Sequence, residues 1–114
     1  MPVKNTPWKL YLDDIRHPAD TTYIVARTVE EAKQLIEQYG VPEHISFDHD
    51  LGVDDRGDLI PDGYDFAKWL VAMDMEGVIK LPKNFTFEVH SKNPVGAENI
   101  RAYLSSYLSQ KAVD

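Results

Sequence analysis

The sequence predicts a single small α/β domain in which helices pack against a parallel β-sheet. Short β-branched and aromatic segments alternate with amphipathic segments of helical period, the pattern that typically gives parallel strands joined by helices. The length, 114 residues, is ordinary for one domain, and a hydrophobic content of 43% is sufficient for a core. We expect the domain to span residues 1–114, with its core at about 8–108.

Four short apolar segments are the predicted strands, and they cover residues 8–12, 23–26, 44–47 and 85–89. The segment after the first strand contains Pro18, which disfavours an immediate helix. The first helix is therefore predicted after the second strand. Thr28 and Glu31 have the spacing of a capping box at its start, and Gly40 marks its end.

Two further helices are expected in the second half of the chain. Asp62 is the predicted N-cap of a helix that ends near Gly77, with an apolar face of Phe66, Trp69, Leu70 and Met73. Asn93 followed by Pro94 is typical of a helix start, and this last helix fades into a polar tail at 111–114. The Asp-rich residues 53–61 are predicted to form a polar loop or a small hairpin.

The composition excludes several classes of protein. Twelve basic and nineteen acidic residues give a net charge of −7, which argues against a broad nucleic-acid surface but leaves room for a nucleic-acid end in a local pocket. The absence of cysteine excludes disulfides and thiolate metal sites. The sequence has no apolar run of signal-peptide or membrane-spanning type, so we expect a cytoplasmic protein without a membrane partner.

Polar clusters follow three of the four predicted strands directly. The clusters are Asp13-Asp14, Asp48-His49-Asp50 and His90-Ser91-Lys92-Asn93. Because parallel strands end at the same edge of a sheet, where open α/β sheets bind their ligands, we expect the clusters to meet there. Asp48 and Asp50 are expected to share one face while His49 turns away, unless the strand has already ended.

A divalent cation is the simplest way to stabilise so many carboxylates in one place. Like charges packed together disfavour their own ionised forms unless a cation neutralises them. Oxygen ligands suit Mg²⁺ and Mn²⁺, and an added imidazole also admits Fe²⁺ or Zn²⁺. The candidate metal ligands are Asp13, Asp14, Asp48 and Asp50, and Mg²⁺ or Mn²⁺ is the predicted cofactor.

Each cluster also has a purely structural interpretation. An isolated Asp13-Asp14 pair is commonly an ordinary strand-to-turn pair, and Asn93 is more simply a helix cap than a ligand. His17 and His44 are expected to be structural or solvent-facing, and the acidic residues of 53–61 to form a solvated loop. The clusters indicate a site jointly, because they fall at equivalent ends of successive strands.

The order of these motifs resembles the response-regulator receiver domain. Asp13-Asp14 matches its acidic pair, Asp48 its phosphoryl acceptor, Ser91 its hydroxyl residue and Lys92 its lysine. The resemblance implies a flavodoxin-like three-layer sandwich with a mainly parallel four-stranded sheet, strand order about 2-1-3-4. The chain departs from receivers in lacking a helix after the first strand and a complete βα unit, and in its insertion before Asp62.

With these departures, the sequence resembles a smaller family, the cyclic-phosphate processing receiver-like domain. The motifs that carry this second resemblance are Asp13-Asp14-Ile15-Arg16, Asp48-His49-Asp50-Leu51-Gly52 and His90-Ser91-Lys92-Asn93, within a match from about Trp8 to Leu108. The resemblance implies processing of cyclic phosphate ends, in RNA repair or in nucleotide-based defence.

The predicted function is metal-dependent hydrolysis of a phosphate ester, with a small ester or a nucleic-acid end as partner. Asp48 would bind metal at the reacting centre, His90 or His49 would act as acid or base, and Arg16 and Lys92 would clamp phosphoryl oxygens. Ser91 and Asn93 are further candidate ligand-binding residues. Two alternatives stay open: a phospho-acceptor or regulatory interaction module, and a ligand-binding protein without catalysis. The sequence makes no prediction of oligomeric state.

Overall fold

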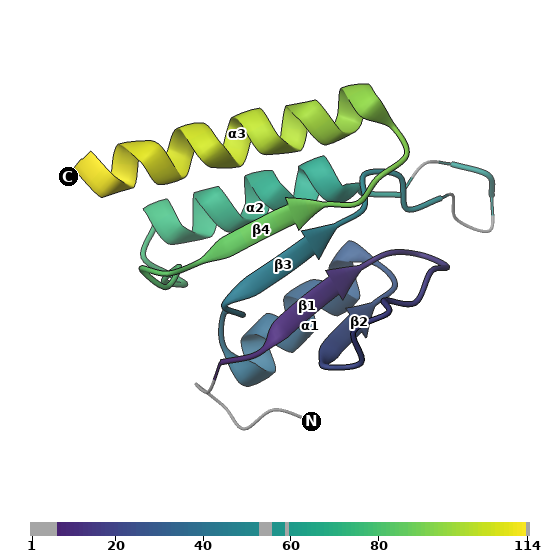
Figure 1. Ribbon diagram of the computed structural model, residues 1–114, viewed down its shortest axis with the longest axis horizontal. Helices are drawn as coiled ribbons and strands as arrows, with labels where there is room; N and C mark the ends of the chain where they lie inside the picture. The colour runs from purple at the N-terminus through teal and green to yellow at the C-terminus, as the bar shows by residue number, and fades with distance from the viewer. Residues whose placement is uncertain (1–6, 53–55, 59, 114) are drawn as a thin grey trace.

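A parallel four-stranded sheet forms the centre of the computed structural model, which describes residues 7–52, 56–58 and 60–113 (Figure 1). The strands are β1 (Lys9–Leu12), β2 (Tyr23–Ala26), β3 (His44–Phe47) and β4 (Thr86–Val89), in the order β2-β1-β3-β4. The register pairs Leu12 with Ala26 and with Phe47, and Phe47 with Val89. The predicted receiver-like α/β fold, its strand order and its parallel sheet are confirmed.

In the described part of the chain, three helices follow β2, β3 and β4 in turn. They are α1 (Val29–Tyr39), α2 (Gly63–Met75) and α3 (Pro94–Val113). All three begin where the sequence predicts, and α3 continues through the tail in which it was expected to fade. Residues 13–22, all of them described, form a loop to β2 and no helix, as Pro18 indicates.

The helix caps agree with the sequence patterns, with one difference at α1. The Thr28 side chain accepts a hydrogen bond from the Glu31 amide at 3.1 Å, but the Glu31 carboxylate accepts from the Arg27 amide instead of returning to Thr28. A complete capping box is found at α2, where Asp62 and Asp65 each accept the other's amide at 2.9 Å. These bonds satisfy amides that the first turn of a helix leaves without partners.

The layering differs from the predicted three-layer sandwich, because α1, α2 and α3 all pack on one face of the sheet. Their buried side chains join alternate strand residues in a single core that includes Leu10, Leu12, Ile45, Phe47, Val29, Ala32, Ile36, Phe66, Leu70, Ile100 and Leu104. Figure 1 shows β1 in front of α1 and β4 in front of α2. The crossovers from β2 to β3 and from β3 to β4 run in the same direction across the sheet, so right-handed connections place α1 and α2 on one side, and α3 packs beside α2. The loop after β1 takes the place of the helix that would cover the other face.

The face without helices, within the described part of the chain, carries polar and aromatic side chains. Tyr11 and Tyr23 pack edge to face at 5.5 Å, and the Tyr23 hydroxyl donates to Glu88 at 2.9 Å. His44 contacts Thr86 at 2.7 Å and Glu88 at 3.2 Å. These cross-strand pairs stabilise the exposed side of the sheet without a second apolar layer.

The predicted loop or hairpin at 53–61 lies partly outside the described residues, which exclude 53–55 and 59. The described part of this segment contains a turn at Arg56 and Gly57 and no strand. Among the described residues, no helix combines the length and the apolar character needed to cross a lipid bilayer.

Candidate functional site

β1, β3 and β4 end in register, and the first residue after each strand continues the backbone ladder. The Asp48 amide donates to the Leu12 carbonyl at 2.9 Å, and the His90 amide donates to the Phe47 carbonyl at 2.9 Å. The Asp13 amide donates to the opposite neighbour, Ala26, at 3.1 Å. Because side chains alternate along a strand, Asp13, Asp48 and His90 project from the same row, on the face that lacks helices.

These three side chains form one compact group. Asp13, Asp48 and His90 each offer a ligand atom, and these atoms all lie within 4.8 Å of one another. Asp13 is fully buried and Asp48 is 6% exposed, while His90 is partly exposed. Two carboxylates and an imidazole at this spacing are a set of donors suited to a divalent cation of the Mn²⁺, Fe²⁺ or Zn²⁺ type, and oxygen donors also suit Mg²⁺.

Backbone amides hold Asp13 in place. Its Oδ1 accepts hydrogen bonds from the amides of Ile15 and Arg16, both at 2.9 Å, and its Oδ2 lies 3.0 Å from His90 Nε2. The Arg27 guanidinium donates to the backbone carbonyls of Asp13 and Arg16, at 3.1 and 2.6 Å, and so fixes the loop that follows β1. A carboxylate held in this way presents its second oxygen in one direction.

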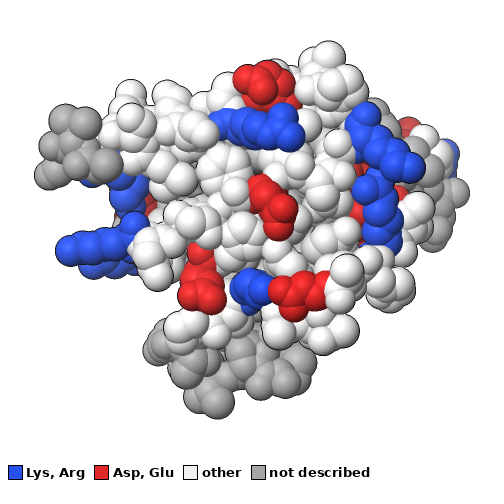
Figure 2. All heavy atoms as spheres, viewed as in Figure 1, with Lys and Arg blue, Asp and Glu red and all other residues white. Residues whose placement is uncertain are grey.

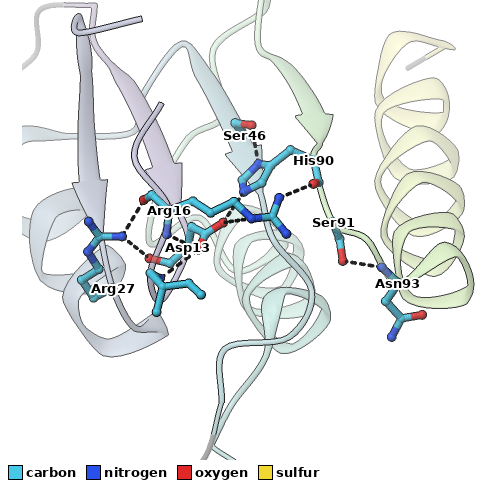
Figure 3. Close-up of polar contacts among 8 residues, drawn as sticks. Asp13, Arg16, Arg27, Ser46, His90, Ser91 and Asn93 are labelled. Carbon is cyan, nitrogen blue, oxygen red and sulfur yellow. Dashed lines mark hydrogen bonds and ion pairs between the residues drawn. The ribbon is translucent and has the colours of Figure 1, made fainter. Parts of the chain in front are cut away.

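Arg16 places a guanidinium beside Asp13 and His90 (Figure 3). Its NH1 donates to the His90 carbonyl at 3.2 Å, and its Nε lies 3.8 Å from Asp13 Oδ2. Arg16 has five N–H donors in a fixed plane, and these two contacts orient that plane at the edge of the site. The remaining donors are suited to an anionic ligand such as a phosphoryl group.

The two buried carboxyl groups have opposite pKa shifts. Burial raises the pKa of Asp48, and the neighbouring negative charge of Asp13 raises it further. Burial also acts to raise the pKa of Asp13, but the amides of Arg16 and Ile15 together with His90 outweigh it, so that this pKa is lowered. The site without a cation therefore stabilises one negative charge at Asp13 and disfavours the second at Asp48.

Asp14 and Asp50, the other two predicted ligands, lie outside the group of three. A Cβ added at Gly52 would lie 3.4 Å from Asp14 Oδ2, so the Asp14 carboxylate faces the loop after β3. Asp50 is not on the same face as Asp48, because β3 ends at Phe47 and the chain turns. Its carboxylate, 67% exposed, contacts His49 at 2.9 Å and the Asn93 amide group at 3.4 Å.

His49 turns away from Asp48, as the sequence predicts, and lies between the first turns of α2 and α3. Its Nδ1 is 2.9 Å from Asp50 Oδ1 and its Nε2 is 3.5 Å from Asp62 Oδ2. The ring packs on Gly96, where any Cβ would overlap it. The His49 ring thus contacts Asp50, Asp62 and Gly96, and these contacts place it at the helix ends and not in the position of an acid or base.

Gly96→Ala should destabilise the protein by about 1–3 kcal/mol, because the new methyl group meets the His49 ring. An ordinary exposed helical Gly→Ala change is instead stabilising. Urea unfolding of Gly96→Ala, His49→Ala and the double variant measures the coupling. We expect the double variant to be more stable than the sum of the single effects predicts. Additive effects, or a stabilising Gly96→Ala, would contradict this packing.

After His90, the polar residues that follow β4 mainly stabilise the start of α3. Asn93 Oδ1 accepts the Gly96 amide at 3.0 Å, which confirms the helix-cap interpretation of Asn93. Ser91 Oγ accepts the Asn93 amide at 3.1 Å and braces the same turn. Lys92 is exposed at the same edge of the sheet.

Three residues of the site escaped the sequence analysis: Ser46, Tyr11 and Arg27. Ser46 Oγ lies 2.7 Å from His90 Nδ1, and the Tyr11 ring stacks on the His90 ring at 4.4 Å with an interplanar angle of 5°. Ser46 carries the one signal that could have been noticed, since it is a hydroxyl residue inside an otherwise apolar strand. Arg27 and Tyr11 carry none, because only the register shows what they face.

The fold and this site define a receiver-type α/β protein with a buried acidic pair and a histidine at the carboxyl ends of its strands. Residues 8–106 match the family model described as the cyclic-phosphate processing receiver domain. The chain therefore belongs to the cyclic-phosphate processing receiver family, and the suspected family is confirmed.

Comparisons with other proteins add support for the fold alone. No curated protein matches the chain. One similar solved structure is a fusion protein that carries the trimeric coiled coil of yeast Spc42; it is 19% identical, with a TM-score of 0.52, and the match covers 99% of this chain and 85% of that one. At 19% identity, this similarity supports the fold and nothing further.

Proposed function

We propose that this protein is a divalent-cation-dependent phosphoesterase that opens a cyclic phosphate on a nucleotide or an RNA end. The observation that carries the proposal is the convergence of Asp13, Asp48 and His90 within 4.8 Å at the end of a parallel sheet. The family, whose description names cyclic-phosphate processing, supports the choice of substrate class.

The electrostatics of the group favour a bound cation. A cation would relieve the repulsion between the two carboxylates, which raises the pKa of Asp48 in its absence. Mixed oxygen and imidazole donors bind Mn²⁺ well, so we expect Mn²⁺ to support activity at least as well as Mg²⁺. Asp14 and Asp50 lie nearby as candidate outer ligands.

The chemistry follows from what these side chains can do. A cation at Asp13, Asp48 and His90 would supply a bound water of lowered pKa and would polarise a phosphoryl oxygen. Arg16, already oriented by Asp13 and the His90 carbonyl, would bind a non-bridging oxygen as negative charge develops there. The exposed Lys92 is a candidate for the second contact to phosphate.

The surroundings of the site suit a small ligand or a chain end. On the sheet face seen in Figure 2, described basic and acidic side chains alternate with uncharged surface instead of forming one basic stretch. Duplex binding requires many neighbouring phosphate contacts. A single phosphate at the strand ends requires only the cation and Arg16.

Incubation with 2′,3′-cyclic nucleotides tests the proposal. We expect ring opening to a nucleoside monophosphate with Mn²⁺ or Mg²⁺, and none with a chelator. Chromatography of the products measures the rate and shows which oxygen is released. An absence of turnover with every cation and every base would contradict the proposal.

A phospho-acceptor role is the second candidate, and the position of Asp48 favours it. Asp48 directly follows β3 and faces Asp13, the arrangement by which the sequence resembles receivers. Incubation with acetyl phosphate and Mg²⁺ would then give a stable phosphoryl mass increase that Asp48→Asn abolishes. An unmodified chain under these conditions would exclude this role.

A further inference from the structure

Ser46 is a buried hydroxyl in β3, and it lies next to the His90 ring (Figure 3). The residue is 2% exposed, and its Oγ is 2.7 Å from His90 Nδ1. A buried hydroxyl without a partner would lower stability, so this contact is what the position requires. Ser46 belongs to the face without helices, one row below the group of three.

Three contacts fix the orientation of the His90 ring. Tyr11 stacks on it in parallel, Ser46 contacts Nδ1, and Asp13 Oδ2 lies 3.0 Å from Nε2. The ring therefore has one orientation, and what can still change is which nitrogen carries the proton. An ionised Asp13 only accepts hydrogen bonds, so in the absence of a cation Nε2 carries a proton, and in the neutral ring Nδ1 then accepts from the Ser46 hydroxyl.

Binding of a cation by His90 requires the opposite arrangement. Nε2 lies 3.0 Å from Asp13 Oδ2, whereas Nδ1 contacts Ser46, so Nε2 is the nitrogen available to a cation, and only when its lone pair is free. Nε2 then loses its proton to water, Nδ1 gains one from water, and the charge of the ring is unchanged. The new Nδ1–H group then requires a hydrogen-bond acceptor. The atom in contact with Nδ1 is Ser46 Oγ.

We propose that Ser46 is a positioning residue that allows His90 to change tautomer when a divalent cation binds among Asp13, Asp48 and His90. The proposal rests on the cation site of the proposed function and deepens it. A serine hydroxyl suits this role because it donates in one state and accepts in the other after rotation about a single bond. Partners of this kind fix the tautomer of metal-binding histidines and typically change metal affinity by about 10–100-fold.

Zn²⁺ binding and the state of the His90 ring provide the test. Zn²⁺ is the probe because it is diamagnetic and accepts carboxylate and imidazole ligands. Long-range ¹H–¹⁵N correlation spectra distinguish the two tautomers, and calorimetry gives the Zn²⁺ affinity. For the parent we expect Nε2–H without Zn²⁺ and Nδ1–H with it. Ser46→Ala should bind Zn²⁺ about tenfold more weakly or worse.

Two further variants separate positioning from a structural effect. Ser46→Thr keeps the hydroxyl and should restore most of the affinity. Ser91→Ala removes a hydroxyl that contacts the Asn93 amide and not His90, so it should bind Zn²⁺ as the parent does. If Ser46→Ala does not fold, the His90 tautomers in the spectra of the parent and of Ser46→Thr, with and without Zn²⁺, test the role of Ser46.

The outcomes separate this proposal from the proposed function. An Nδ1–H tautomer before Zn²⁺ is added, or parental affinity in Ser46→Ala, would overturn the role of Ser46. A tautomer change with Zn²⁺ but no hydrolysis of cyclic nucleotides would support Ser46 and contradict the phosphoesterase. No Zn²⁺ binding at His90 would overturn both.

Discussion

Asp48→Asn should abolish the stabilisation that Mn²⁺ gives and reduce cation-dependent turnover by about 100-fold or more, without lowering the stability of the cation-free protein. The pKa of Asp48 is raised by burial and by the charge of Asp13, so the ionised carboxylate is destabilising near neutral pH when no cation is present. A neutral amide of similar shape removes that repulsion. It also removes an anionic ligand, so the same change weakens cation binding.

Thermal unfolding with and without Mn²⁺ measures both effects. Saturation at about 100 times the dissociation constant stabilises a protein by about 2.7 kcal/mol, which corresponds to a Tm rise of about 10 °C for a chain of this size. We expect that rise in the parent and in the control Glu98→Gln, an exposed residue of α3. Equal Mn²⁺ shifts in Asp48→Asn and the parent would contradict the assignment of Asp48 as a ligand.

Asp13→Ala should be the most destabilising single change at the site, at about 2–4 kcal/mol. The substitution leaves the amides of Ile15 and Arg16 without their acceptor, and it removes the partner of His90 Nε2. The loop after β1 replaces the helix that other receivers have there, so its anchoring depends on such contacts. Its displacement would also move Arg16 away from the site.

Urea unfolding of Asp13→Ala and Asp13→Asn provides the comparison. The Asn side chain retains one carbonyl oxygen that can accept from Ile15 or Arg16, so its loss of stability should be clearly smaller. Both variants should lose cation-dependent activity, because both lack the carboxylate. If Asp13→Ala were as stable as the parent, the buried hydrogen bonds of this loop would contribute little.

Most of the fold could be predicted because local patterns decide it. Alternating apolar segments indicate the strands, and Pro18, Gly40 and Asn93 limit the helices through their own backbone chemistry. The layering was not predicted correctly, since the resemblance to receivers implied helices on both faces. In the described residues a loop and not a helix joins β1 to β2, so no helix covers the second face there.

From the sequence, only the site residues that directly follow a strand could be predicted. Asp13, Asp48 and His90 come together because each is the first residue after a strand, and the strands end in register. Asp50 was misplaced relative to this group, because β3 ends at Phe47 and the Asp50 carboxylate contacts His49 and Asn93 instead. Ser46 was missed because its partner is 44 residues away in the chain.

A crystal structure of the protein soaked in Mn²⁺, with anomalous scattering data, tests the central claim most directly. The account predicts one strong peak that contacts carboxylate oxygens of Asp13 and Asp48 and the Nε2 of His90, with the protein ligands at about 2.0–2.3 Å. No peak at these three side chains, or a peak held only by Asp50 and Asp62, would contradict it.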